Sequence, residues 1–376
     1  MRRIAWIAPT LLWWVACTPD FTPMSFVDKP RILGIVAEPP EVAFSEDAPG
    51  SVTLQAVVAL PGPDRDGVQA DAELTGLSWA LCVLSLGAGA GYACAVPEFP
   101  VGDADLATRT ATFDGALLVA QMELIRGFLP EYIAFLKQIV TQDDACNLAV
   151  IADWEACLAA NGDDPAPCGD ATFAAARACM AEGGIELMFH ATATVTVDGT
   201  PRTVDAYKRV AFRAPKEGRE PNRNPGFRVR LGEAEVAATD GQGLGATVAV
   251  CPGAKITFEP ELFEDAIERN PDAEPAADGT PAEEFLFLSW VATSGDFDRI
   301  KSSIAVVDED DPIDLTNEWT AWEADEMPAE STAWVFARDD RLGVSYVTFP
   351  LVRWDGPECA TEPDFAKVLD GEGGAP

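Results

Sequence analysis

Short segments in which apolar and polar residues alternate dominate the first half of the chain. Five segments carry this alternation or an apolar run of strand length: 31–36, 52–60, 74–84, 185–197 and 203–213. A period of two residues is typical of a β-strand with one buried face. Asp198-Gly199, between the last two segments, is a strong hairpin signal. We therefore expect an antiparallel β-sandwich over residues 31–213.

A helical pattern interrupts this sandwich. Residues 115–140 are strongly apolar with roughly helical spacing, and Gly127 and Pro130 lie where a helix would break or bend. Further helical signals follow, so we expect a helical insertion over residues 115–183. An apolar helix of this kind usually packs into a core. The alternative is a helix that binds a partner or touches a membrane.

Four cysteines in this insertion follow one another at intervals of eleven residues: Cys146, Cys157, Cys168 and Cys179. Eleven residues complete about three helical turns with ~20° left over, so Cys146 and Cys157 share one helix face. We expect this helix to stop at Asn161-Gly162 and a second helix to be capped by Asp170. When the hairpin is folded about its loop, Cys157 meets Cys168 and Cys146 meets Cys179.

This spacing resembles the twin-cysteine helical hairpins called coiled-helix–coiled-helix, over about 40 residues and in geometry only. Four cysteines also suit zinc, but structural zinc sites pair cysteines two to four residues apart. Export to an oxidising compartment favours disulfides. We therefore expect two nested disulfides and no metal in the insertion.

Strand signals resume after a polar segment at 214–226, which holds three prolines and is interpreted as a linker. The pattern that follows predicts a second β domain over residues 227–359. Within it, Asp339-Asp340-Arg341-Leu342 lies between two strand segments and is interpreted as a hairpin turn. Residues 360–376 are expected to form a flexible tail.

A weak internal repeat connects the two β domains. Leu77-Ser78-Trp79 in the first domain matches Leu288-Ser289-Trp290 in the second. Immunoglobulin-like sandwiches keep a core Trp on their third strand, so the pattern resembles tandem immunoglobulin-like domains. The alternative is two sandwiches of unrelated topology. The expected fold class is mainly β: two immunoglobulin-like antiparallel sandwiches, the first with an inserted, disulfide-stapled α-helical region.

The N-terminal residues have the features of an export signal. Arg2 and Arg3 precede an apolar run at 4–16, which is too short to span a bilayer as a helix. The run ends in Trp14-Val15-Ala16-Cys17, which resembles a bacterial lipobox. In signals of that class the leader, here residues 1–16, is removed and the cysteine is lipidated. The alternative is an ordinary secretory leader with Cys17 as a plain thiol.

The residues after the lipobox indicate where the protein would be held. Residues 17–30 contain three prolines and are expected to form a tether. Thr18 resembles the residue found after the cysteine in outer-membrane lipoproteins. We therefore expect an outer-membrane lipoprotein, facing the periplasm or the cell surface. The chain as a whole resembles uncharacterised bacterial lipoproteins.

The cysteine count agrees with a lipid on Cys17. The chain has nine cysteines, so eight remain for disulfides if Cys17 is modified. Two pairs are left outside the insertion. Cys82 and Cys94 flank a Gly-rich turn, and Cys251 and Cys359 would tie an early strand of the second domain to the C-terminal region.

The chain is strongly acidic, with 62 acidic and 26 basic residues and a net charge of −36. Phosphate backbones repel such a surface, which disfavours nucleic acid, and we expect no nucleic-acid partner. The acids are spread along the chain, which favours a role in solubility over cation binding. The densest run, Asp308-Glu309-Asp310-Asp311 with Asp314 nearby, lacks an EF-hand pattern and is interpreted as a solvated loop; Ca²⁺ binding is the alternative.

The sequence contains no motif that defines a catalytic site. His190 is the only histidine and lies in an alternating strand, which favours a structural role. No nucleophile elbow or Walker-type phosphate loop occurs. We expect no catalytic residues, no metal and no cofactor.

The expected function is a non-enzymatic binding or structural module of the cell envelope, by analogy with other sandwiches. Its partners are the membrane, through the lipid, and an envelope or extracellular protein or glycan. The alternative is an envelope polysaccharide hydrolase that uses paired carboxylates, although 62 acids do not single out a pair.

Peptide mapping without reduction tests the nested pairing. We expect peptides that join Cys157 to Cys168 and Cys146 to Cys179. A peptide that joins Cys146 to Cys157 would contradict the hairpin geometry.

Overall fold

The computed structural model describes residues 24–369 except 46–48, 65–67, 84, 86–90, 95–96, 118–125, 140–144, 217–218, 272, 274, 276–277 and 304–313. The expected signal peptide, Cys17 and the acidic run 308–311 lie outside the described residues. Among the helices that are described, none has the length and apolar character needed to cross a membrane.

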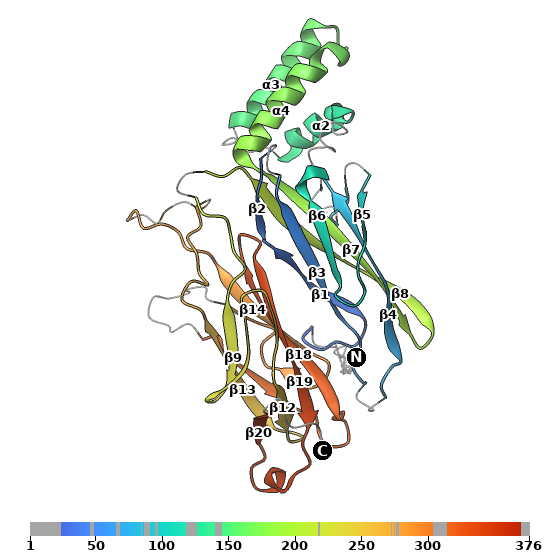
Figure 1. Cartoon of the computed structure of the whole chain (residues 1–376), viewed down its shortest axis with the longest axis vertical. Helices are drawn as coiled ribbons and strands as arrows, with labels where there is room; N and C mark the ends of the chain where they lie inside the picture. The colour runs from blue at the N-terminus through green and yellow to red at the C-terminus, as the bar shows by residue number, and fades with distance from the viewer. Residues whose placement is uncertain are drawn as a thin grey trace, which may run out of the picture.

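The first half of the chain forms two facing β-sheets (Figure 1). The smaller sheet has the order β1-β3-β6, formed by Arg31–Glu38, Ser51–Ala59 and Thr110–Asp114. The larger has the order β2-β8-β7-β4-β5, formed by Glu41–Ala43, Thr200–Arg213, Ile185–Val197, Ala72–Cys82 and Phe99–Asp103. Side chains of both sheets fill one core, among them Trp79, Phe113, Phe189 and Phe212.

Strand β7 shows how the alternating pattern produces this core. Its fully buried side chains recur at every second position: Leu187, Phe189, Ala191, Ala193 and Val195. Strand β7 continues into β8 through Asp198 and Gly199, whose φ angles are 48° and 75°. Both residues therefore have the left-handed backbone of a two-residue hairpin turn. The predicted hairpin is confirmed.

The second half of the chain forms another pair of facing sheets around a separate core. One sheet has the order β10-β9-β13-β17-β15, formed by Ala234–Thr239, Phe227–Leu231, Lys255–Leu262, Asn317–Thr320 and Asp296–Phe297. The other has the order β16-β14-β18-β19-β12-β20, formed by Lys301–Ser303, Leu286–Ala292, Glu330–Asp339, Val344–Arg353, Thr247–Val250 and Ala366–Leu369. Strand β11 (Gln242–Leu244) pairs in parallel with β19.

These sheets confirm the predicted mainly β fold with a helical insertion in the first sandwich. Trp79 and Trp290, the tryptophans of the weak repeat, are each buried in the core of their own half. The predicted hairpin turn at 339–342 lies between β18 and β19, with Asp339 as the last residue of β18 and Asp340, Arg341 and Leu342 in the turn.

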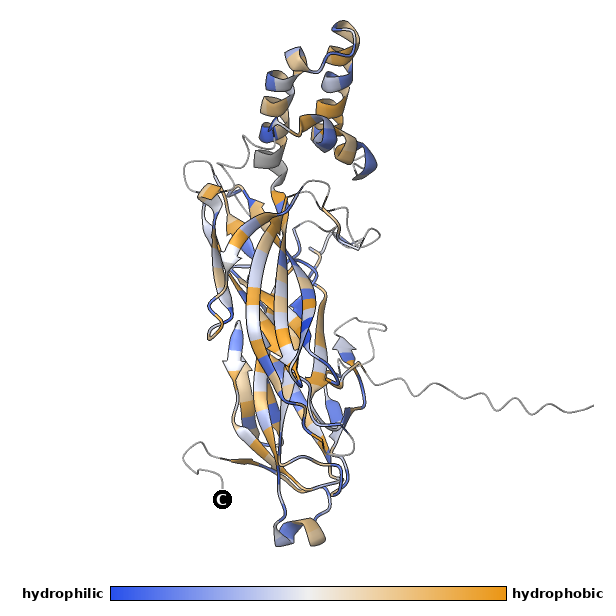
Figure 2. Cartoon of the chain, turned by 90° about the vertical axis from the view of Figure 1, so that its right-hand side faces the viewer, coloured by the Kyte–Doolittle hydropathy of each residue, from blue (hydrophilic) through white to orange (hydrophobic). Residues whose placement is uncertain are grey.

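The insertion lies between β6 and β7 and projects beyond the sheets at one end of the molecule (Figures 1 and 2). It contains α2 (Leu129–Ile139), α3 (Ala145–Ala160) and α4 (Gly169–Gly183). Helix α2 buries Leu129, Tyr132, Ile133 and Leu136 in the core of the first sandwich. Its apolar face is therefore core, the first of the two alternatives for this segment.

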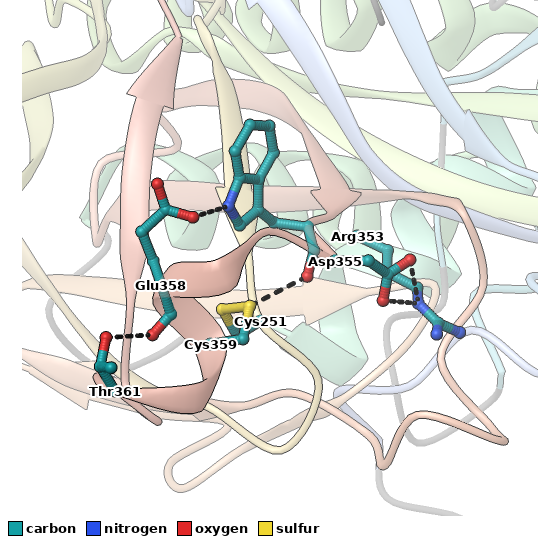
Figure 3. Close-up of a disulfide and its surroundings, with 7 residues drawn as sticks. Cys251, Arg353, Asp355, Glu358, Cys359 and Thr361 are labelled. Carbon is teal, nitrogen blue, oxygen red and sulfur yellow. Dashed lines mark hydrogen bonds and ion pairs between the residues drawn. A yellow bond between two sulfur atoms is a disulfide. The ribbon is translucent and has the colours of Figure 1, made fainter.

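The structure brings together all four expected cysteine pairs. Two bonds, Cys146–Cys179 and Cys157–Cys168, connect the helices of the insertion. Cys82 bonds to Cys94, and Cys251 bonds to Cys359. Figure 3 shows this last bond between the end of β12 and the short 3₁₀-helix at Pro357–Ala360. Beside it, the ring N–H of Trp354 donates to Glu358 at 3.1 Å.

The described parts of two segments that composition predicts to be loose contact the sandwiches. The expected tether extends to residue 30, yet Val27 is fully buried and its N–H donates to the carbonyl of Ala292 at 3.0 Å. The expected flexible tail contains β20, which pairs antiparallel with β12. Ala366–Leu369 are therefore part of a sheet of the second sandwich. Composition missed both contacts because their partners are distant in the sequence.

Candidate functional site

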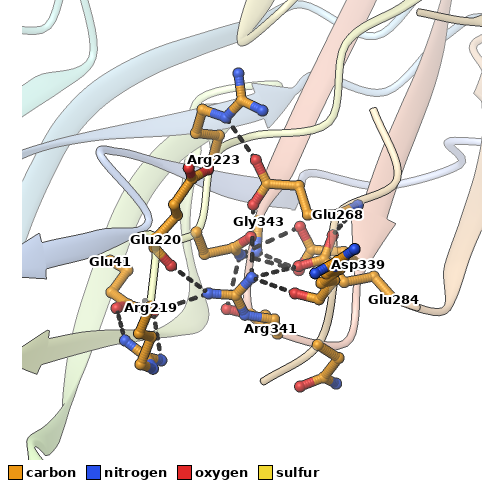
Figure 4. Close-up of polar contacts among 12 residues, drawn as sticks. Glu41, Arg219, Glu220, Arg223, Glu268, Glu284, Asp339, Arg341 and Gly343 are labelled. Carbon is orange, nitrogen blue, oxygen red and sulfur yellow. Dashed lines mark hydrogen bonds and ion pairs between the residues drawn. The ribbon is translucent and has the colours of Figure 1, made fainter. Parts of the chain in front are cut away.

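Arg341 lies buried where the two sandwiches meet. It belongs to the turn between β18 and β19, and only 5% of its side chain is exposed. Its guanidinium contacts three carboxylates, those of Glu41 (3.4 Å), Glu268 (3.5 Å) and Glu284 (3.1 Å). It also donates to the backbone carbonyl oxygens of Glu220 and Arg269. Figure 4 shows these groups converging on one side chain.

Glu41 is the carboxylate that the first sandwich contributes to this cluster. It lies on β2, only 4% of its side chain is exposed, and it accepts two hydrogen bonds from Arg219 as well as the bond from Arg341. A buried charge is costly unless it is paired and hydrogen-bonded. The two arginines and the three carboxylates therefore depend on one another for their burial.

The segment between the sandwiches, 214–226, is part of the junction at its C-terminal end. Asn224 donates to the carbonyl of Ala37 at 2.9 Å and accepts from the N–H of Val344 at 2.9 Å. Asn222 donates to Asp339 and to the carbonyl of Arg341. Both asparagines are buried. This part of the predicted linker is therefore a structural element, because its amides satisfy backbone groups of both halves.

Apolar side chains extend the junction beside the charged cluster. Val27, Val36, Val57 and Ala59 of the first half pack with Trp334, Phe336, Val344 and Tyr346 of the second. Arg338 lies 4.7 Å from the Phe336 ring centre and donates to the carbonyl of Leu33 at 3.0 Å. Burial lowers the pKa of Arg338 to about 10. The two halves are therefore joined by a continuous packed surface.

The turn that carries Arg341 is itself fixed by close contacts. Asp339 accepts a hydrogen bond from the N–H of Gly343 at 2.6 Å. A Cβ at Gly343 would lie 2.0 Å from an Asp339 oxygen and 2.8 Å from the carbonyl oxygen of Arg223, so this position requires glycine. Lys208 of β8 donates to the carbonyl of Leu342, which adds another bond between the halves.

Burial changes the protonation of several junction groups. It raises the pKa of Glu284 to about 7, an effect that the charge of Asp339 reinforces and Arg341 opposes. It lowers the pKa of Lys208 to about 7, with Asp339 opposing the shift. The pKa of Asp339 is raised, also mainly by burial. Burial therefore disfavours the charged forms of Glu284, Lys208 and Asp339.

Two cavities flank the junction. One, of about 620 Å³, is lined by Arg219, Arg223, Asp265, Glu268 and Arg341 among others. Its carboxylates Asp265 and Glu268 both bond to Arg223. The other is a cleft of about 280 Å³ between β8 and the turn after β18, and its lining includes Tyr92, Tyr207, Arg209 and Phe287.

His190 lies next to this cleft, in a polar and aromatic group on the larger sheet of the first sandwich. Its Nδ1 lies 3.1 Å from Glu98 and its Nε2 lies 3.0 Å from Asp205. Its ring stacks on Tyr207 with centroids 4.5 Å apart, and Tyr207 stacks on Tyr92 at 5.3 Å. Burial raises the pKa of Tyr207, and the charges of Asp205 and Glu98 add to this shift.

The other residues singled out from the sequence lie apart from the junction. Asp314, beside the acidic run, accepts hydrogen bonds from Arg299 and Thr316. Within the described residues, no group of three or more His, Cys, Asp or Glu side chains is arranged to hold a metal ion. Cys17 stays a predicted lipidation site.

Sequence reasoning missed Arg341 and its glutamate partners. They are a few charges among 62 acidic and 26 basic residues, and Arg341 lies 300 residues from Glu41. One local signal was available, since Arg341 occupies a tight turn between two very apolar strands.

The chain matches no protein-family model and no curated protein. Among solved structures it is similar to the fibronectin(III)-like modules of Clostridium thermocellum CbhA. That match has 11% identity and a TM-score of 0.18, and it covers 85% of this chain and 95% of the other. At this TM-score the likeness supports no statement about function, and the fold is defined by the sheets themselves.

The pH dependence of unfolding tests the buried state of Glu284. Because its pKa is higher in the folded chain than the ordinary value of 4.5, its stabilising contribution is complete at low pH and is lost as the pH rises towards 7. Between pH 4.5 and 7, the unfolding free energy of the wild type should fall relative to Glu284→Gln by roughly 1–3 kcal/mol in urea titrations. The neighbouring exposed Glu283→Gln should follow the wild type, and parallel profiles for the wild type and Glu284→Gln would contradict the assignment.

Proposed function

We propose that the chain is a lipid-anchored protein of the bacterial cell envelope that acts as a rigid, non-enzymatic binding module. One observation carries this proposal: the buried cluster around Arg341 fastens two sandwiches into one body. A junction in which one buried guanidinium contacts three carboxylates resists hinge motion, because opening it would separate buried charges from their partners. Such a body is suited to holding a binding surface at a fixed orientation.

The proposed location rests on two independent features. The leader and Cys17 match a lipoprotein signal. Four disulfides within the described residues suit an oxidising compartment outside the cytoplasm. Outer-membrane attachment, with Cys17 as the anchor, is part of the proposal.

A binding role also fits the carboxylates of the larger cavity. A glycosidase needs one carboxyl group that donates a proton and a second that acts as base or nucleophile. Asp265 and Glu268 are instead ion-paired with Arg223, and Glu268 also contacts Arg341. These pairs favour a structural role for both carboxylates in the wall of the cavity.

Envelope binding by the unlipidated protein tests this function. The Cys17→Ser protein should leave the membrane fraction, whereas Cys82→Ser/Cys94→Ser should stay in it, because only Cys17 carries the proposed lipid. Purified Cys17→Ser protein should then bind isolated cell envelopes saturably in a sedimentation assay. Retention of Cys17→Ser in the membrane would contradict the anchor, and sedimentation that never saturates would contradict the binding role.

A further inference from the structure

Exposed aromatic side chains gather around the cleft between the two sandwiches. Among the described residues, the large hydrophobic side chains that are exposed include three aromatic ones: Tyr92 (38%), Tyr207 (37%) and Phe285 (41%). Tyr92 and Tyr207 line the cleft from the first half, and Phe287 lines it from the second. Phe285 packs beside Phe287, with ring centroids 6.2 Å apart. Aromatic surface exposed at one place indicates a binding site.

The ring of Tyr92 is held in place at a conformational cost. Its φ of 59° lies in the left-handed region, which is unusual for a bulky residue. Cys94, two residues further along the chain, is bonded to Cys82 at the end of β4, and the Tyr92 ring stacks on Tyr207. Strained residues of this kind persist where the surroundings fix them, commonly at ligand sites.

Hydrogen-bonding groups accompany these rings. Glu98 and Asp205 contact His190 from its two sides, and their side chains remain 33% and 47% exposed. Arg209, on the cleft wall, pairs with Glu186 and is 56% exposed. The rings are therefore accompanied by carboxylate acceptors and a guanidinium donor that solvent, or a ligand, can reach.

We propose that this cleft binds a glycan chain without negative charge. A sugar ring has an apolar C–H face that packs on aromatic rings and a rim of hydroxyls that donate to carboxylates and accept from arginine. The net charge of −36 disfavours anionic glycans. A cleft of about 280 Å³ accommodates a short stretch of the chain, with the remainder extending along the surface.

This inference rests on the proposed function, because it names the partner class of the binding module. The proposed site also depends on the junction, because the two sandwiches each contribute a wall of the cleft. Tyr207 lines it from β8 and Phe287 lines it from β14. The cleft keeps its shape only while the two halves stay fixed relative to each other.

Calorimetric titration of the folded Cys17→Ser protein with two neutral probes tests the site. The probes are the hexamers of β-1,4-linked glucose and β-1,4-linked N-acetylglucosamine. We expect saturable binding of at least one probe, weakened at least tenfold by Tyr207→Ala and largely kept by Tyr207→Phe, which retains the ring. Leu244→Ala is the matched control, because Leu244 is 83% exposed and does not line the cleft.

Several outcomes would overturn the glycan proposal. The proposal fails if neither hexamer binds saturably, or if Tyr207→Ala binds a hexamer as tightly as the parent protein does. It also fails if a lysine-rich peptide, in place of the sugars, binds at a Tyr207-dependent site. Envelope sedimentation separates the two proposals. If Tyr207→Ala still binds envelopes saturably, the binding function stands and the glycan site fails; if the parent protein does not bind envelopes, the function itself fails.

Discussion

The burial of Arg341 between carboxylates of both sandwiches is the constraint on which the rest of the structure depends. A guanidinium loses its hydration when it is buried, and ion pairs and hydrogen bonds with its surroundings compensate for that loss. Here the partners come from β2, from the loop before β14 and from the segment that joins the halves. Removing one member of such a buried pair typically costs about 3–5 kcal/mol, because its partner is left unpaired. The cluster therefore fixes where the second sandwich sits on the first.

The disulfides stabilise parts of the chain outside this charged cluster. In the insertion, Cys146–Cys179 joins α3 to α4 and Cys157–Cys168 joins α3 to the short 3₁₀-helix at Ala166–Cys168. Cys251–Cys359 connects the C-terminal region to the end of β12. A bond that closes a loop of about 100 residues stabilises a protein by roughly 4–5 kcal/mol in the chain-entropy account. None of the four bonds crosses between the sandwiches, so the junction relies on non-covalent contacts. The walls of the aromatic cleft come from both halves, so the shape of the cleft depends on those contacts.

Local patterns in the sequence predicted the strands and helices, whereas contacts between residues far apart in the sequence determine how these elements are arranged. The alternation on β7 and the Asp198-Gly199 turn identified a hairpin because both signals lie within neighbouring residues. The eleven-residue cysteine spacing similarly matches the bonds of α3 and α4. The junction was not predictable, because Arg341 and Glu284 are 57 residues apart and each resembles an ordinary surface charge. The aromatic cleft was missed for the same reason, since Tyr92, Tyr207 and Phe287 lie on separate elements.

The central claim is that the two sandwiches form one rigid body, and a distance measurement between them tests it most directly. Spin labels on Cys17→Ser protein carrying Thr203→Cys on β8 and Thr257→Cys on β13 would report that distance by pulsed electron resonance, since both positions are exposed. The junction predicts one narrow distance distribution, which broadens when Arg341→Met removes the buried charge. A broad distribution in the protein with Arg341 intact would contradict the account.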